Sequence, residues 1–225
     1  MVHCFQGVEG LKAAGIADDM WRLRYRTFIE EQKWPLPSSK QREWDCYDDE
    51  DAVYLVSFDN DGAISASARL IPTTGDFLMR DIFAHLVSDI SALPTGPSVV
   101  EFTRYFVRSD LVKSRRLIQL TGEIFCSVFE HCLDAGVDTF LAIVDIRVLP
   151  QLYELGWTIK PLGLPGAFGG GVSENGGGRA IAIQVDITTS ALHSTAACRQ
   201  VALPVLSAHD DFIRTPQIDP TMSVN

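Results

Sequence analysis

The chain has 225 residues, of which 46% are hydrophobic and 21% charged, so it can bury an apolar core and is not a disordered, collagen-like or coiled-coil sequence. Its 19 basic and 29 acidic residues give a formal charge of −10, which disfavours nucleic acid and anionic membranes as primary partners. No apolar run approaches the ~20 residues of a membrane span, and residues 1–7 lack the basic and apolar parts of a secretory signal. We therefore expect a cytoplasmic protein.

The cysteines and histidines show no metal-binding pattern. The five cysteines are odd in number and scattered, and the sequence contains neither a Cys-x-x-Cys pair nor a His-x-x-x-His pair. We expect reduced thiols and no bound metal.

Hydrophobic spacing predicts an α/β chain in which hairpin strands come first and helix–strand alternation follows. In chain order, we expect a helix at 10–33, strands at 52–58 and 63–71, a helix at 77–87, a strand at 99–107, a helix at 114–135, a strand at 139–144, a helix at 149–155, and strands at 157–162 and 180–187. With no internal repeat and no linker, the sequence indicates a single domain over 1–203. The tail over 204–225 is expected to be loop or partly disordered.

The first predicted helix carries a charge on an apolar stripe. Arg24 lies four residues from both Met20 and Phe28, so its guanidinium either snorkels along the helix edge to solvent or faces a site. Trp34, just beyond this helix, is either a core residue or a flat surface for a ligand.

Charges also interrupt two apolar strands. Arg69 lies near the end of strand 63–71, and Glu101 and Arg104 lie within strand 99–107, where an unpaired charge is costly. Residues three apart on an ideal strand face opposite sides. Glu101 and Arg104 therefore serve different faces, or a bulge brings them together. A single buried ion pair is the alternative interpretation.

Two other segments resemble known binding loops, for calcium and for phosphate, but lack the residues that such loops need. The acidic segment 45–51 lacks the alternating ligands and the turn glycine of an EF-hand loop, although Asp45 and Asp48 stand directly before a buried strand. The glycine-rich segment 163–178 lacks the Lys-Ser/Thr of a phosphate-binding loop, and no Gly-x-Ser-x-Gly supplies a serine nucleophile.

Taken together, these charged and aromatic residues resemble the signature of the acyl-homoserine-lactone synthases, the bacterial quorum-sensing autoinducer synthases. The resemblance extends from residue 24 to residue 162, most of the chain. The matching positions, in order, are Arg24, Phe28, Trp34, Asp45, Asp48, Arg69, Phe83, Glu101 and Arg104.

The resemblance implies a fold and a reaction. The fold is like that of the GCN5-type N-acyltransferases, a mixed central sheet splayed into a cleft and flanked by helices. In the reaction, the amine of S-adenosylmethionine attacks an acyl thioester. The methionine carboxylate then closes on its own γ-carbon, which expels methylthioadenosine and leaves an acyl-homoserine lactone. S-adenosylmethionine is a substrate here, so no cofactor is expected.

The chemistry of S-adenosylmethionine fits the residue types of the resemblance. Its sulfonium and ammonium call for carboxylates and aromatic faces, and its carboxylate calls for a guanidinium. The resemblance makes Glu101 and Arg104 catalytic, with Glu101 as general base, directly or through a water. Backbone N–H groups of Phe102 and Thr103 are candidates to hold the oxyanion. Residues expected to bind S-adenosylmethionine or the thioester are Arg24, Phe28, Trp34, Asp45, Asp48, Arg69, Phe83, Phe102 and Thr103.

The acyl chain requires an apolar slot. Its expected walls are strand segment 140–144, the start of the next helix and the face of helix 114–135, although ordinary core packing explains each of them equally well. The residues of this candidate pocket are Leu141, Ile143, Ile146 and Leu149.

Two donors are compatible with the sequence, an acylated acyl carrier protein and an acyl-coenzyme A. A carrier protein is acidic and needs a basic patch, for which the candidates are Arg108, Lys113, Arg115 and Arg116. Segment 108–114 contains no glycine, unlike the pyrophosphate turn of ordinary GCN5-type enzymes, which counts against coenzyme A. Family members that use coenzyme A thioesters nevertheless exist.

Two alternative functions share this fold. One is a GCN5-like N-acyltransferase that uses acyl-coenzyme A on another small amine, and the other is a non-catalytic small-molecule binding module. Neither calls for the whole set of charged residues in the signature.

Overall fold

We describe residues 1–112, 116–167 and 178–207 of the protein from a computed structural model. The strands form one sheet in the order β1-β2-β3-β4-β5-β8-β6, with β7 paired to β8. Only β4 and β5 run parallel, and all other neighbouring strands are antiparallel. The strands are β1 Val2–Gln6, β2 Val53–Phe58, β3 Ile64–Pro72, β4 Val99–Val107, β5 Thr139–Asp145, β6 Ile159–Pro161, β7 Gly166–Ala167 and β8 Arg179–Asp186.

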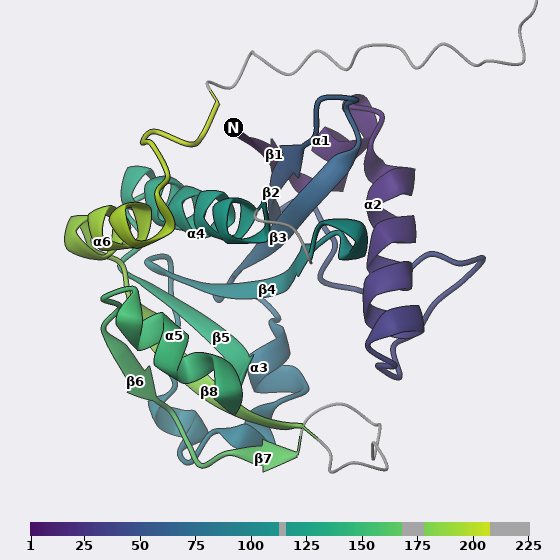
Figure 1. Ribbon diagram of the computed structural model, residues 1–225. Coiled ribbons are helices and arrows are strands. Elements are labelled where there is room, and N and C mark those ends of the chain that lie inside the picture. The colour runs from purple at the N-terminus through teal and green to yellow at the C-terminus, as the bar shows by residue number, and fades with distance from the viewer. Residues whose placement is uncertain (113–115, 168–177, 208–225) are drawn as a thin grey trace, which may run out of the picture.

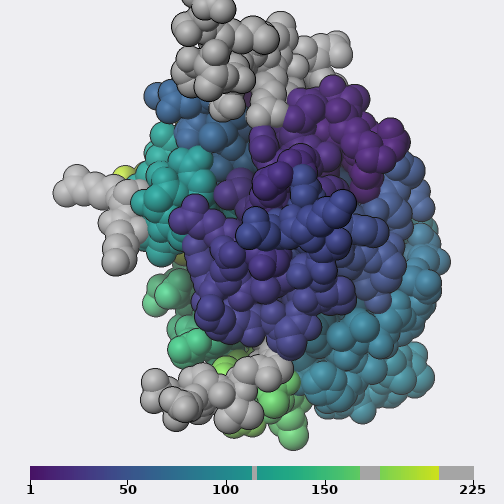
Figure 2. Space-filling view, turned by 90° about the vertical axis from the view of Figure 1, so that its right-hand side faces the viewer, coloured from purple at the N-terminus to yellow at the C-terminus, as the bar shows by residue number. Residues whose placement is uncertain are grey.

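Helices cover both faces of the sheet. On one face, α4 (Arg116–Asp134), α5 (Leu149–Glu154) and α6 (Thr189–Arg199) enclose the largest core cluster. On the other, α1 (Gly7–Ala13) and α2 (Ala17–Arg24) cover the N-terminal strands, and α3 (Leu78–Asp81) covers the middle of the sheet. Figure 1 shows α4 and α6 together on one side of the sheet and α2 on the other. In Figure 2, the N-terminal segments, purple to blue, spread over the middle of the visible face.

The predicted helix 10–33 is wrong as a single element. Gly15 adopts a φ of 67°, a left-handed conformation that separates α1 from α2. After Arg24 the helix continues as a π-helix over Tyr25–Glu31. π-Helical turns are rare and occur frequently at functional sites. Here, the turn follows directly after the first charged residue of the signature.

Other elements differ from the sequence-based expectation in length or existence. The helix expected over 77–87 is confined to α3, followed by a 3₁₀ turn at Ala84–Leu86. Strand β1 and helix α6 were not predicted. The sequence of α6 is rich in Ala, Ser and Thr and has only Leu192 as a large buried apolar residue, so its helical stripe is faint. Thr188 begins α6 by accepting a hydrogen bond from the Ala191 N–H at 3.1 Å.

The chain from 205 to 207 packs beside β1. The N–H of Val2 donates to the carbonyl of Val205, and the N–H of Ser207 donates to the carbonyl of Val2. The Glu130 carboxylate of α4 accepts the N–H groups of Val205 and Leu206. The free edge of β1 is therefore paired along this short stretch; the remaining tail, 208–225, lies outside the described residues.

The sheet splays between β4 and β5, as the GCN5-type fold expectation requires. These strands pair only from Val99 to Phe102 against Thr139 to Ala142. Beyond that point β4 continues along β3 and β5 continues along β8. The two strands diverge in Figure 1 beyond their paired residues.

A bulge in β4 brings Glu101 and Arg104 to one face, so this alternative is confirmed. Ser67 and Arg69 are two residues apart on β3, whereas their partners Phe106 and Thr103 are three apart on β4. Arg104 is the extra residue and has a φ of 49°, in the left-handed region. The side chain of Arg104 consequently falls on the same face as those of Glu101 and Thr103, whereas Tyr105 faces α4.

No helix in the described ranges is long and apolar enough to cross a membrane.

Close packing of α4 against α6 generates a stability prediction. A Cβ atom at Gly122 would lie 2.5 Å from Cβ of Arg199 and 2.8 Å from Cγ2 of Val201. We expect Gly122→Val to lower the free energy of unfolding by about 2 kcal/mol because the helices must separate. Urea denaturation measures the change. Gly75→Ala is the matched control, since nothing lies within 4 Å of its Cβ position; an equal loss in both variants would contradict the packing argument.

Candidate active site

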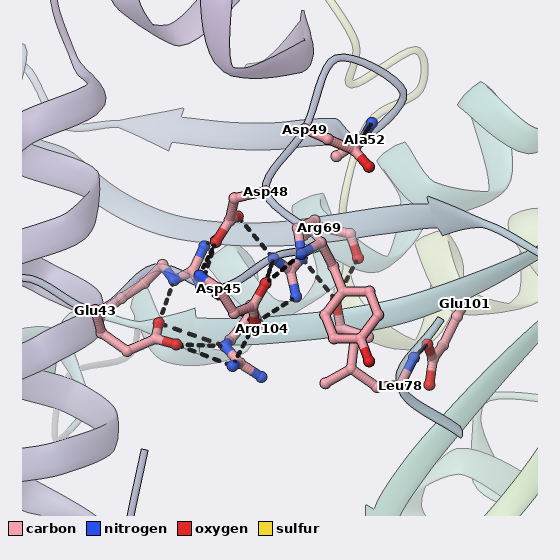
Figure 3. Close-up of polar contacts among 12 residues, drawn as sticks. Glu43, Asp45, Asp48, Asp49, Ala52, Arg69, Leu78, Glu101 and Arg104 are labelled. Atoms are coloured by element: carbon pink, nitrogen blue, oxygen red, sulfur yellow. Dashed lines mark hydrogen bonds and ion pairs between the residues drawn. The ribbon is translucent and has the colours of Figure 1, made fainter. Parts of the chain in front are cut away.

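Three arginines and three carboxylates form one buried cluster between α2 and the sheet (Figure 3). Arg24 donates to Glu43 at 2.6 Å and holds Asp48 with both terminal nitrogens at 2.7 and 3.0 Å. Arg69 holds Asp45 in the same two-pronged manner at 2.7 and 3.1 Å. Such paired bonds fix the orientation of both groups.

Arg104 completes the cluster from the bulge of β4. Its guanidinium donates to Glu43 at 2.9 Å and to Asp45 at 2.6 Å. Arg69 also contacts Asp48 at 2.7 Å, so every carboxylate of the cluster serves at least two arginines. The six charges come from α2, the loop 43–48, β3 and β4, and formally they cancel.

The electrostatics of the cluster keep its groups charged. Burial alone raises the pKa of Asp48, but the guanidiniums of Arg24 and Arg69 hold that pKa well below its usual range. Burial likewise opposes the charge of Arg24, whereas the neighbouring carboxylates raise its pKa. The pKa of Arg104 is lowered by burial and by repulsion from Arg24. Arg104 is thus the only one of the three clustered arginines whose pKa is lowered, and it is also the only one of the three that lines the adjacent cavity.

Glu43 was not predicted as a site residue from the sequence, although it is fully buried and bridges Arg24 and Arg104. Its signal was the Glu-x-Asp-x-x-Asp spacing over 43–48, which places three carboxylates in one short loop. The N–H of Glu43 donates to the carbonyl of Trp21, which ties this loop to α2.

Glu101 lies apart from the cluster, beside the start of α3 (Figure 3). Its two carboxylate oxygens accept the N–H groups of Leu78 at 2.7 Å and Met79 at 2.8 Å. Burial raises the pKa of Glu101 to about 7, although these two N–H groups favour its ionised form. A carboxyl group with this pKa exchanges a proton readily near neutral pH.

A cavity of about 790 Å³ opens beside these groups. Its polar part is formed by Asp45, Glu101, Thr103 and Arg104, and its apolar part by residues of α3, of segment 34–37 and of β5. The predicted site residues that line the cavity are Trp34, Asp45, Phe83, Glu101, Phe102, Thr103, Arg104 and Ile143. Lining residues that the sequence analysis did not select include Leu36, Trp44, Tyr47, Leu78 and Ile82.

Four of the predicted substrate-binding residues lie behind this lining. Arg24, Arg69 and Phe28 are each only 1% exposed, and the side chain of Asp48 is equally buried. Phe28 stacks on Trp34 with ring centroids 5.0 Å apart, and the Arg104 guanidinium lies 5.7 Å from the Phe28 ring. These residues therefore support the groups at the cavity surface from behind.

Of the four candidate acyl-pocket residues, only Ile143 lines the cavity. Leu141 is fully buried where β4 and β5 are still paired, and Leu149 packs against the opposite core. Ile146 lies beyond the end of β5 and is 36% exposed. The structure offers a different apolar wall, formed by Leu78, Ile82 and Phe83 on and after α3.

The candidate carrier-protein patch is placed only in part. Arg108 forms ion pairs with Asp59 at 2.9 Å and Asp110 at 2.8 Å. Arg116 is exposed at the start of α4, whereas Lys113 and Arg115 lie outside the described residues. Two carboxylates thus already neutralise Arg108.

Comparison with known protein families shows to which family the chain belongs. A family model described as an autoinducer synthase matches residues 9–173. The chain belongs to the autoinducer synthase family. It is 36% identical over 166 residues to the isovaleryl-homoserine lactone synthase of Bradyrhizobium diazoefficiens, a match that covers 73% of each chain. It is 31% identical to an acyl-homoserine-lactone synthase of Pseudomonas aeruginosa, over 71% of this chain and 77% of that one.

Solved structures of this family have the same fold. A CoA-dependent acyl-homoserine lactone synthase, BjaI, solved with S-adenosylmethionine and isopentyl-CoA, matches with a TM-score of 0.77 and 31% identity over 92% of each chain. The synthase LasI matches with a TM-score of 0.75 at 19% identity, which shows the fold alone. The GCN5-like fold predicted from the resemblance is confirmed for this autoinducer synthase.

Among the described residues, no group of three or more His, Cys, Asp or Glu side chains is arranged to hold a metal ion. All three clustered carboxylates are instead occupied by arginines.

The balance of the buried cluster leads to a prediction for Glu43. We expect Glu43→Gln to lower the free energy of unfolding by about 3–5 kcal/mol, because it leaves a buried positive charge without its partner. Chemical denaturation measures the loss. Glu9→Gln is the control, since Glu9 pairs with Lys12 in solvent and such pairs contribute about 1 kcal/mol or less. Similar losses in the two variants would show that the cluster does not depend on charge balance.

Proposed function

We propose that this synthase transfers an acyl group from a coenzyme A thioester to the amine of S-adenosylmethionine and releases an acyl-homoserine lactone. The observation that carries the proposal is the cavity in the splayed sheet. There, a carboxylate of raised pKa, a guanidinium and a second carboxylate face one apolar wall. Membership of the autoinducer synthase family supports this assignment.

The polar end of the cavity suits S-adenosylmethionine. Asp45, whose side chain is 14% exposed, would attract the sulfonium or ammonium, and Arg104 would bind the carboxylate. Trp34 offers an aromatic face to the sulfonium. The buried residues Arg24, Asp48 and Arg69 would hold these groups in place without touching the substrate.

Glu101 is suited to remove a proton from the attacking amine. Each carboxylate oxygen accepts one backbone N–H and retains a second lone pair. The amine then attacks the thioester carbonyl, the carbon–sulfur bond breaks and the thiol leaves. In the second step the methionine carboxylate displaces methylthioadenosine from its own γ-carbon. The N–H groups of Phe102 and Thr103, next to the bulge, are candidates to bind the oxyanion.

The apolar end suits the acyl chain. Leu78, Ile82 and Phe83 face Ile143 across the opening where β4 and β5 have separated. Burial of a hydrocarbon chain there would contribute about 0.8 kcal/mol for each methylene group.

Coenzyme A is the donor that the partly neutralised patch and the relatives favour. The net charge of −10 does not separate the two donors, because it repels the phosphates of coenzyme A as well as an acidic carrier protein. The candidate patch is weakened because Arg108 is already paired with Asp59 and Asp110. The relative BjaI is CoA-dependent and was solved with an acyl-CoA, which supports the same donor class here.

Three expectations from the sequence accompany this proposal. We propose that the protein acts in the cytoplasm, that S-adenosylmethionine is a substrate without any resident cofactor, and that nucleic acid and membranes are not partners. The negative net charge supports the last of these.

The reaction is tested with purified protein, S-adenosylmethionine and an acyl-CoA series that includes isovaleryl-CoA. We expect equal amounts of free thiol and methylthioadenosine, and mass spectrometry should detect the lactone with its acyl group. The same acyl groups on a carrier protein should give a kcat/KM at least about tenfold lower. A carrier-protein preference would overturn the donor assignment, and no lactone with either donor would overturn the proposed function.

The pKa of Glu101 leads to a pH prediction. Only the ionised carboxylate can accept a proton, so kcat/KM should fall about tenfold for each pH unit below about 7 and level off above it. Initial rates of thiol release from pH 5.5 to 8.5 measure this profile. Glu101→Gln should abolish turnover but retain S-adenosylmethionine binding. A wild-type profile that stays flat down to pH 5.5 would exclude Glu101 as the titrating base.

A further inference from the structure

The apolar wall of the cavity rests on a very short helix. Helix α3 has four residues, too few to be stable through its own hydrogen bonds. Its residues Leu78 and Met79 are buried, whereas Ile82, which follows the helix and lines the cavity, is 57% exposed. The position of the wall therefore depends on bonds from other elements.

The first of these bonds comes from β4, where Glu101 binds the N–H groups at the start of α3. The second comes from the loop that carries the clustered carboxylates. The Tyr47 hydroxyl donates to Oδ2 of Asp81, the last residue of α3, at 3.2 Å. Burial, reinforced by the Asp81 carboxylate, raises the pKa of Tyr47, so its hydroxyl keeps the proton that it donates.

Tyr47 is fixed directly to the polar end of the cavity. Its N–H donates to Oδ1 of Asp45 at 3.0 Å, and the same oxygen accepts a bond from Arg69. The tyrosine side chain is 7% exposed and itself lines the cavity. A short path of bonds thus leads from Asp45 through Tyr47 to Asp81 and the apolar wall.

We propose that Tyr47 and Asp81 are positioning residues that couple the two ends of the cavity, so that a ligand on Asp45 sets the wall that receives the acyl chain. The inference rests on the proposed function for the identity of the two ligands. A nucleoside ligand at the polar end would restrain Asp45 and, through Tyr47, the end of α3. The acyl donor would then bind to a wall that is already in place.

The test is a binding measurement without turnover. Titration calorimetry gives the affinity for a thioether analogue of the acyl-CoA, which cannot donate an acyl group, with and without saturating S-adenosylmethionine. We expect S-adenosylmethionine, whose cationic groups Asp45 would hold, to tighten analogue binding about fivefold in the wild type. The ratio of the analogue's two dissociation constants, without and with this ligand, should fall close to one in Tyr47→Phe and in Asp81→Ala, because either change removes the hydrogen bond between Tyr47 and Asp81. Asp81→Asn keeps an acceptor oxygen and should retain most of the wild-type ratio.

Two matched variants separate coupling from general damage. Tyr54→Phe removes the other tyrosine–carboxylate bond of this region, from Tyr54 to Asp48 at 2.8 Å, without touching α3. Asp76→Ala removes the second carboxylate partner of Arg80 and leaves Tyr47 alone. Both should keep the wild-type ratio, even if Tyr54→Phe weakens S-adenosylmethionine binding.

The outcomes are distinct. A wild-type ratio of one, or an unchanged ratio in both Tyr47→Phe and Asp81→Ala, would overturn the coupling. A purely structural role would weaken both ligands and leave the ratio unchanged, which also counts against it. Failure of the wild type to make any lactone counts against the proposed function instead, because the binding ratio does not depend on turnover.

Discussion

The structure depends on keeping six charges balanced in a largely buried cluster, of which only Asp45 and Arg104 reach the cavity. A buried guanidinium or carboxylate costs several kcal/mol unless its partners are well placed. In this protein each carboxylate of the cluster binds at least two arginines, so no single pair carries the whole cost. The local irregularities follow from this requirement. The bulge at Arg104 and the loop 43–48 both bring charges to one point that regular secondary structure would keep apart.

The same requirement divides the acidic residues into two chemical kinds. Asp48 lies between two arginines, which hold it ionised despite burial. Glu101 is buried to a similar degree but is bonded to backbone N–H groups, and its pKa is raised to about 7. One side chain provides a fixed charge and the other a titratable group. The protein achieves this difference by the placement of arginines, with the same functional group in both positions.

Several of these features were accessible from the sequence. Charges inside the apolar strands at Arg69, Glu101 and Arg104 indicated a buried polar site, and the bulge was one of two stated geometries. Glu43 was not accessible in the same way, because a glutamate in a polar loop carries no hydrophobic pattern against which it stands out. The acyl wall was placed on β5 because strand periodicity does not show where two strands separate. Leu141 and Ile143 share a face, but only Ile143 lies past the last paired residues.

The two ends of the cavity are held by different numbers of bonds and therefore differ in rigidity. The polar end is held by bidentate ion pairs from several elements, so its geometry is defined by many bonds at once. The apolar end rests on a four-residue helix fixed mainly at its two ends, by Glu101 and by Tyr47. Recognition of a charged nucleoside demands fixed geometry, whereas a hydrocarbon chain is bound by contact area and tolerates variation. A change in the residues of α3 can therefore alter the acyl group that fits while the charged cluster remains intact.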